Sequence, residues 1–256
     1  MKYKALMLDV DGTLIPYEYD ALPSNRVADA IKKAKKKVIV CLVTGRSYGP
    51  QLEKILKKLE MSDGYVVSDT GGHVVNLATK KELYDQPINS EDLQKITGIL
   101  FRHHILFYAK TQLHEDRYAR YAIKQDEKLQ KAYMIYSKEH NTSEEIEAVL
   151  KELSGLSTIS VNKTLHKSPD KYGLNIMHVN ATKLHGVEII MKATGIKKEE
   201  IIGIGDSYND FPLLMASGLK VAMGNGVDEL KAIADYVAPS VLQDGVADVI
   251  DKYILS

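Results

Sequence analysis

The sequence predicts an α/β fold, in which both ends of the chain build a doubly wound parallel sheet and a smaller α+β domain is inserted between them. Three observations predict it. Short apolar runs alternate with helical patterns in residues 1–84 and 181–256, as is typical of strands buried on both faces. Between residues 85 and 180 this regular alternation gives way to helix, strand and charged segments. Polar residues directly follow several apolar runs, where open sheets bind ligands.

Length and charge limit the classes of function. The chain has 256 residues, enough for a core domain and a smaller second one. Lys and Arg number 34, as do Asp and Glu, and this balance disfavours nucleic acid or an anionic membrane as a partner. The sequence enters its first strand without a signal peptide and has no apolar run long enough to span a bilayer, so we expect a cytoplasmic protein. The oligomeric state cannot be predicted.

The first apolar run begins at Ala5 and ends in two acids. Asp9 and Asp11 lie at i and i+2, so on an extended chain they point the same way. Gly12 allows a sharp turn, and Thr13 offers a hydroxyl there. Two adjacent carboxylates repel unless a cation or a shared proton relieves them. The simpler alternative is that both acids cap a turn.

A helix and a second buried strand follow. Ser24 is the expected N-cap of a helix that ends in Lys35, Lys36 and Lys37, whose charges suit the negative end of the helix dipole. The next apolar run, residues 38–43, contains Cys41. A single cysteine excludes an internal disulfide and a thiolate metal cluster, and we expect it to be buried as a small hydrophobe.

Thr44, Gly45 and Arg46 follow this second run, just before a helix predicted over residues 48–59. A hydroxyl, a flexible glycine and a guanidinium beside a helix N-terminus form an anion cradle. The tripeptide alone is a weak signal, because many strands end in Thr-Gly. A third strand over residues 64–68 and a returning hairpin arm from His73 complete this part.

The inserted segment has its own order of elements. We expect helices over residues 90–103, 114–131 and from Thr142 or Ser143 to 153, and strands over residues 105–108, 133–136, 158–161 and 174–177.

The alternation resumes with a helix that opens at Lys183 and ends at Gly195, a C-cap. Its expected apolar stripe is Leu184, Val187, Ile190, Met191 and Ala193. The strand at residues 201–205 then ends in a second acidic cluster, which would repel a dinucleotide's pyrophosphate. Strands over 221–223 and 235–237 and a helix over 244–253 close the chain.

A doubly wound sheet brings the carboxyl ends of its strands to one edge. There we expect Lys183, from a helix start, to meet the strand-end residues Asp9, Asp11, Thr44, Asp206, Asn209 and Asp210. Several carboxylates together require a hard cation, and oxygen ligands favour Mg²⁺ over zinc.

Such a site suits phosphoryl transfer. Mg²⁺ neutralises phosphate charge, while Lys183 and Thr44 add a positive contact and a hydrogen bond. One carboxylate can attack phosphorus to give an aspartyl-phosphate. The second acid can protonate the leaving oxygen and later accept a proton from water.

These motifs together resemble the haloacid dehalogenase superfamily of phosphatases. The resemblance lies in Asp9-Val10-Asp11-Gly12-Thr13-Leu14, Thr44-Gly45-Arg46, Lys183 and Gly205-Asp206-Ser207-Tyr208-Asn209-Asp210. Three features are similar to those of the Cof-type branch of this superfamily: the last motif, the Thr-Gly-Arg form and the tail Asp244-Gly245-Val246-Ala247. The inserted segment resembles its C2B cap. The resemblance implies a Rossmann-like core over residues 1–84 and 181–256 and an α+β cap over residues 85–180.

The resemblance also implies roles for the matching residues. Asp9 would be the nucleophile and a Mg²⁺ ligand, and Asp11 the acid/base with its backbone carbonyl on the metal. Asp206 would be the third protein ligand, with Asn209 and Asp210 ordering its surroundings. The phosphoryl group would be held by Thr44, Gly45, Arg46 and Lys183. The chain departs from the family at Thr70-Gly71-Gly72, where Asn-Gly-Ala is frequent, and at Val241-Leu242-Gln243, where an Asn is frequent. Both changes bear on substrate choice.

We therefore expect a Mg²⁺-dependent phosphomonoester hydrolase for small phosphorylated metabolites, with sugar phosphates first. The cap would close over the site and select the leaving group. The expected lining of its pocket is Tyr108, Tyr118, Tyr121, Tyr172, Arg102 and Lys110. Two alternatives stay open: a phosphotransferase or phosphomutase that uses the same aspartate, and a non-catalytic protein that binds phosphometabolites.

Overall fold

The structure is a computed structural model that describes residues 2–18, 20–111, 129, 131–165 and 170–256. The chain forms two compact units, one of Met1–Asp85 with Thr182–Ser256 and one of Gln86–Ala181. Among the described residues, no helix is long and apolar enough to cross a membrane.

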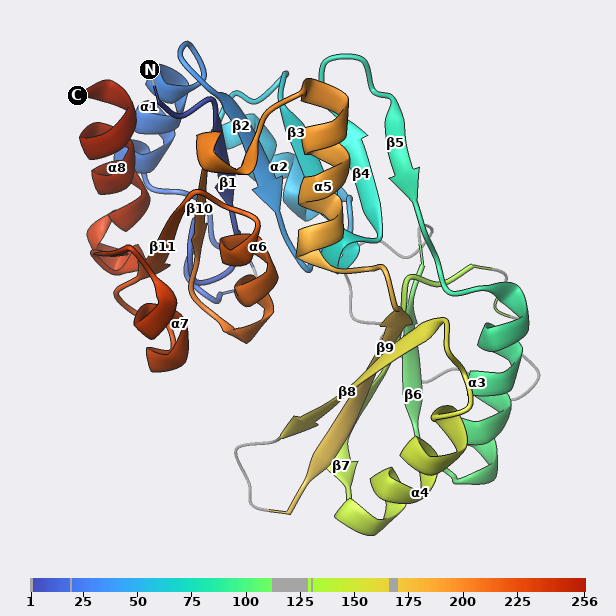
Figure 1. Ribbon diagram of the computed structural model, residues 1–256. Helices are drawn as coiled ribbons and strands as arrows, with labels where there is room; N and C mark the ends of the chain where they lie inside the picture. Colours follow the sequence, from blue (N-terminus) through green and yellow to red (C-terminus); the bar gives the residue numbers. More distant parts are fainter. Residues whose placement is uncertain (1, 19, 112–128, 130, 166–169) are drawn as a thin grey trace. The chain divides into compact units, whose positions relative to one another are not determined.

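The first unit is built on a sheet of eight strands in the order β12-β11-β10-β1-β2-β3-β4-β5 (Figure 1). Its parallel strands are β1 (Ala5–Leu8), β2 (Ile39–Val43), β3 (Tyr65–Ser68), β10 (Ile201–Gly205), β11 (Leu219–Met223) and β12 (Tyr236–Ala238). The remaining strands, β4 (His73–Asn76) and β5 (Glu82–Asp85), pair antiparallel. The chain winds outward from β1 in both directions, so the order of strands reverses between β1 and β10.

Helices cover both faces of this sheet. One face carries α1 (Asn25–Ala34), α2 (Pro50–Lys58) and α8 (Gly245–Ile250), and the other α5 (Lys183–Thr194), α6 (Phe211–Met215) and α7 (Asp228–Ile233) (Figure 1). Alternate residues of β1 enter the two cores, with Leu6 and Leu8 on the α1 side and Ala5 and Met7 on the α5 side. The predicted doubly wound fold is confirmed.

The second unit has an antiparallel sheet in the order β6-β7-β9-β8. Its elements are β6 (Phe107–Lys110), β7 (Met134–Asn141), β8 (Ile159–Leu165), β9 (Tyr172–His178), α3 (Ser90–Arg102) and α4 (Ser143–Leu153). Both helices pack on one face of the sheet, against residues such as Phe107 and Ile176 (Figure 1). Thr142, one of the two residues predicted as the cap, begins α4 and forms a capping box with Glu145.

Among the described residues, those expected to line a pocket of this unit do not share one surface. Tyr108 stacks on Tyr136 on the face without helices, with ring centroids 5.3 Å apart, whereas Tyr172 packs against the core under the helices. Arg102 forms an exposed ion pair with Glu152. Tyr118, Tyr121 and nearly all of the helix predicted over residues 114–131 lie outside the described residues.

Candidate active site

Asp9 lies directly after β1, where the order of strands reverses. Its backbone N–H donates to the Ile204 carbonyl of β10 at 3.0 Å, which extends the pairing of the two strands by one residue. The side chain is buried. Asp9 Oδ1 accepts a hydrogen bond from Lys183 Nζ at 2.5 Å. The strand pairing therefore holds this carboxylate at the crevice where doubly wound sheets bind ligands.

Lys183 is the first residue of α5 and is fully buried. Thr182 caps the helix, with its hydroxyl accepting from the backbone N–H of His185. Lys183 Nζ lies 2.5 Å from both Asp9 Oδ1 and Asp210 Oδ1. Burial alone lowers the pKa of this ammonium, but the charges of Asp9 and Asp210 outweigh it and raise the pKa above its usual value. Lys183 therefore stays charged between the two acids.

A glycine sets the position of Lys183. Gly71 has φ +113°, and a Cβ there would overlap the Thr182 carbonyl oxygen. The turn after β3 can therefore touch the start of α5 only through a glycine. Gly186, one helical turn later, packs its backbone against Val67 of β3, and a side chain there would collide with Val67. The two glycines bring the N-terminus of α5 close to the sheet.

Asp206 and Asp210 follow β10 and are buried. Asp210 Oδ2 accepts the backbone N–H groups of Asp206 and Ser207 at 2.9 and 3.0 Å, so it orders the turn in which Asp206 lies. Asp206 Oδ1 accepts from the Thr13 hydroxyl at 3.2 Å, and Oδ2 accepts from the Tyr17 hydroxyl. The two acidic motifs, far apart in sequence, therefore meet side by side.

The residues present fit a divalent cation. One carboxylate oxygen from each of Asp9, Asp206 and Asp210 lies within 4.8 Å of the others. Burial, followed by the charge of Asp210, raises the pKa of Asp9 well above its usual range despite Lys183, and burial also raises the pKa of Asp206. Positive charge among these oxygens would stabilise the ionised acids, and an all-oxygen set is the donor type that Mg²⁺ prefers.

Arg46 contacts Asp11. Its Nε donates to Asp11 Oδ2 at 2.9 Å and its Nη2 to Oδ1 at 2.6 Å. Thr44, at the end of β2, is fully buried, and its hydroxyl accepts the Arg46 backbone N–H at 3.0 Å. Gly45 is half-buried between them. The predicted anion cradle therefore turns its guanidinium toward the second acid of the first motif.

The remaining predicted residue, Asn209, is exposed on the turn after β10. Sequence reasoning missed two residues of the site. Tyr17 reaches Asp206 from the loop after β1, and Asn225 Nδ2 donates to the Gly12 carbonyl at 2.8 Å. A tyrosine in a loop has no pattern that marks it. Asn225 lies between two glycines after β11, and that turn could have been counted among the strand-end motifs.

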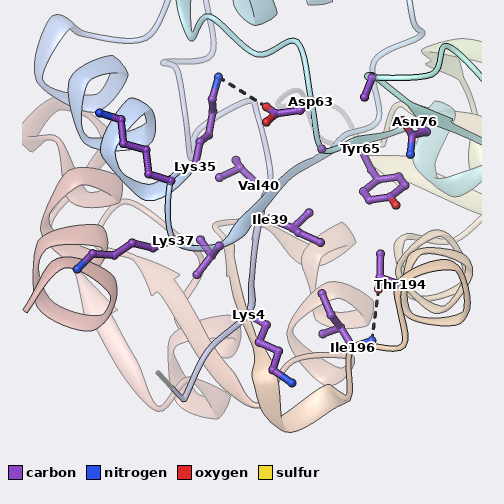
Figure 2. A pocket seen from close by; sticks show the side chains of 14 residues that line it. Lys4, Lys35, Lys37, Ile39, Val40, Asp63, Tyr65, Asn76, Thr194 and Ile196 are labelled. Carbon is purple, nitrogen blue, oxygen red and sulfur yellow. Dashed lines mark hydrogen bonds and ion pairs between the residues drawn. The ribbon is translucent and has the colours of Figure 1, made fainter.

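The same unit has a hollow at the opposite edge of the sheet, beside the residues that lead into β1, β2 and β3 (Figure 2). Its lysines contact neighbouring groups: Lys4 pairs with Glu200 at 2.6 Å, and Lys35 lies 3.7 Å from Asp63. Lys35 also follows the C-terminus of α1, where a cation suits the helix dipole, as predicted. The acidic motifs therefore meet at the other edge of the sheet from this hollow.

Comparisons with known proteins match the whole chain. A phosphoglycolate phosphatase of Methanosarcina acetivorans is 26% identical over 257 residues, 98% of this chain and 96% of its own. A 5-amino-6-(5-phospho-D-ribitylamino)uracil phosphatase of Bacillus subtilis is 26% identical over 259 residues, with the same two coverages. The chain spans about half, 47%, of a chloroplastic endoribonuclease of Arabidopsis thaliana that it also matches at 26% identity.

A solved structure shares the fold over nearly the full length. The structure of BT1666, a phosphatase from Bacteroides thetaiotaomicron, matches with a TM-score of 0.81 at 20% identity, covering 97% of this chain and 94% of its own. The family model for haloacid dehalogenase-like hydrolases matches residues 6–250, which confirms the family that the motifs predicted. The chain belongs to the haloacid dehalogenase-like hydrolases.

Proposed function

We propose that this protein is a Mg²⁺-dependent phosphatase that hydrolyses small phosphorylated metabolites through a phosphorylated Asp9. The observation that carries the proposal is the buried Lys183, which bridges Asp9 and Asp210 beside Asp206. A buried ammonium among three acids costs much stability as a purely structural device. Its position at the ligand-binding edge favours a catalytic use.

Asp9 is the proposed nucleophile because it ends β1 with one oxygen held by Lys183. Its other carboxylate oxygen forms a bond to phosphorus, the bond from phosphorus to the leaving oxygen breaks, and the electron pair departs with that oxygen. Asp11 supplies the proton that this oxygen takes. Bound among Asp9, Asp206 and Asp210, Mg²⁺ would supply positive charge near the phosphate oxygens. The Asp11 backbone carbonyl is a further proposed ligand.

The second half of the reaction returns the enzyme to its starting state. Asp11 accepts a proton from water, the water oxygen forms a bond to phosphorus, and the bond to Asp9 breaks to release inorganic phosphate. The Thr44 hydroxyl and Lys183 hold the phosphoryl oxygens through both steps. Gly45 has no side chain, so the phosphate can approach the backbone of this loop. Asn209, on the turn that Asp210 orders, is exposed.

The substrate class is supported by the relatives. The Methanosarcina protein is named for phosphoglycolate and the Bacillus protein for a phosphorylated ribityl compound, both small phosphorylated molecules. We therefore propose phosphorylated metabolites of this size, with sugar phosphates to be tested first. A balanced net charge agrees with a small substrate rather than a polyanion.

The test is phosphate release from a panel of phosphorylated metabolites, with Mg²⁺ or EDTA. Asp9→Asn keeps the shape of the nucleophile but removes its charge, so we expect release to fall at least about 10³-fold. The matched control is Asp248→Asn, a half-buried acid remote from the site that accepts from Tyr236. Release that survives in Asp9→Asn contradicts the mechanism. Transfer of phosphate to an added sugar, without release, favours a phosphotransferase.

A further inference from the structure

Tyr17 reaches into the acidic cluster from the loop after β1. Its hydroxyl donates to Asp206 Oδ2, although the residue as a whole is 67% exposed. The hydroxyl end of the ring lies close to Gly12. A Cβ at this glycine would stand 2.6 Å from Tyr17 Cζ and would also overlap Asp206 Oδ2. Only glycine at this position lets the ring and the carboxylate approach the backbone together.

The hydrogen bond of Tyr17 occupies the same group that a cation needs. Asp206 accepts from Thr13 through Oδ1 and from Tyr17 through Oδ2, so each of its oxygens already has a hydroxyl donor. A hydroxyl donor withdraws electron density from a carboxylate and occupies space beside it.

We propose that Tyr17 is a latch on the metal site, whose hydroxyl competes with a divalent cation for Asp206. The inference rests on the proposed function, because it takes Asp206 as a metal ligand. When the ring swings into solvent, the main loss is the hydrogen bond to Asp206, since most of the residue's surface is already in contact with water. The Thr13 hydroxyl, one residue after the Gly12 turn, would keep its bond to Asp206. Tyr17 thus sets the concentration of cation at which the site fills.

The experiment measures cation binding without substrate. Mn²⁺ is titrated into full-length wild type and Tyr17→Phe, and free Mn²⁺ is followed by electron paramagnetic resonance. Loss of one competing hydrogen bond should lower the Kd about three- to tenfold. Tyr236→Phe is the matched control, because it removes a tyrosine–aspartate bond of 2.7 Å remote from the cluster, and its Kd should equal that of wild type. An unchanged or higher Kd in Tyr17→Phe overturns the latch.

A further variant separates the two proposals. Asp206→Asn should raise the Kd for Mn²⁺ strongly; if it does not, the proposed metal site and the latch both fail. If Tyr17→Phe tightens Mn²⁺ binding while wild type releases no phosphate from any substrate, the latch stands and the proposed hydrolysis fails. If wild type releases phosphate but the Kd for Mn²⁺ is unchanged in Tyr17→Phe, the proposed hydrolysis stands and the latch fails.

Discussion

Arg46 holds Asp11 through a forked contact, with Nε and Nη2 of the guanidinium on the two carboxylate oxygens at 2.9 and 2.6 Å. The sequence placed Arg46 in an anion cradle, and the structure gives its guanidinium a carboxylate partner. Asp11 is partly exposed, so this contact fixes the direction in which the acid points.

We predict that Arg46→Lys lowers kcat about tenfold or more and changes KM little. A lysine keeps the charge but cannot form the fork, so Asp11 loses its orientation for proton transfer. Steady-state kinetics on the best substrate of the panel measure both constants. Arg26→Lys, an exposed arginine 3.8 Å from Asp251, is the control and should behave as wild type. A large rise in KM with unchanged kcat would instead support Arg46 as a phosphate ligand.

Lys183→Met should destabilise the fold by about 3–5 kcal/mol, because it leaves Asp9 and Asp210 buried without their shared cation. Urea unfolding at neutral pH in EDTA measures the change. Lys192→Met, an exposed lysine of the same helix, should change the free energy of unfolding by less than about 0.5 kcal/mol. Equal midpoints for Lys183→Met and wild type would show that the ammonium is not needed for folding.

Gly71→Ala should impair both stability and catalysis, since its new Cβ would push the Thr182 carbonyl and the start of α5 away from the sheet. Gly195→Ala is a matched control: its φ of +72° is also left-handed, but a Cβ there meets nothing within 4 Å. It should therefore cost only the backbone strain, about 1 kcal/mol. Thermal unfolding and phosphate release measure both effects. Equal effects of the two substitutions would show that the close approach of Gly71 to Thr182 does not position α5.

Asp9→Asn should become more stable than wild type as pH rises. Burial raises the pKa of Asp9 in the folded protein, so its folded form binds more protons than its unfolded form. The stability that the protonated Asp9 contributes is fully present below the pKa of the unfolded chain, about 3.9, and is lost as pH rises through the higher pKa of the folded protein. We therefore expect equal stabilities near pH 4 in EDTA and a growing advantage for Asp9→Asn toward neutral pH, measured by urea unfolding.

The comparison of the two proteins isolates Asp9, because Asp206 and Asp210 are common to both. Lys183 does not titrate in this range, since its raised pKa keeps it charged. A stability difference that stays constant with pH, or an Asp9→Asn protein that is less stable at neutral pH, would show that the ionised Asp9 carboxylate is well accommodated.

Much of the fold follows from patterns that need no tertiary information. Buried parallel strands read as continuous apolar runs, so β1, β2, β3 and β10 were predicted, and Cys41 is buried in β2 as expected. Ser24 caps α1, accepting from the Val27 N–H, and Gly195 ends α5 in the left-handed conformation. The meeting of the two acidic motifs follows from the rule that parallel strands end at one edge.

Two features escaped prediction because tertiary contacts decide them. Strand β5 is short and partly exposed, and it lies where the predicted alternation of strands and helices ends. The apolar stripe predicted for α5 was wrong at Leu184 and Ala193, which are exposed. The helix instead turns Lys183 and Gly186 inward, because Lys183 pairs with two acids and Gly186 lets the helix approach β3.

In the proposed mechanism, Asp9 becomes phosphorylated during turnover. The most direct measurement is peptide mass spectrometry of enzyme quenched in acid during steady-state turnover with Mg²⁺, using the best substrate of the panel or, failing one, acetyl phosphate. We expect one added phosphoryl group on the peptide that contains Asp9, and we expect it to be absent in Asp9→Asn and in the EDTA control. Phosphate release without any phosphorylated peptide, or a phosphoryl group on another residue, would contradict it.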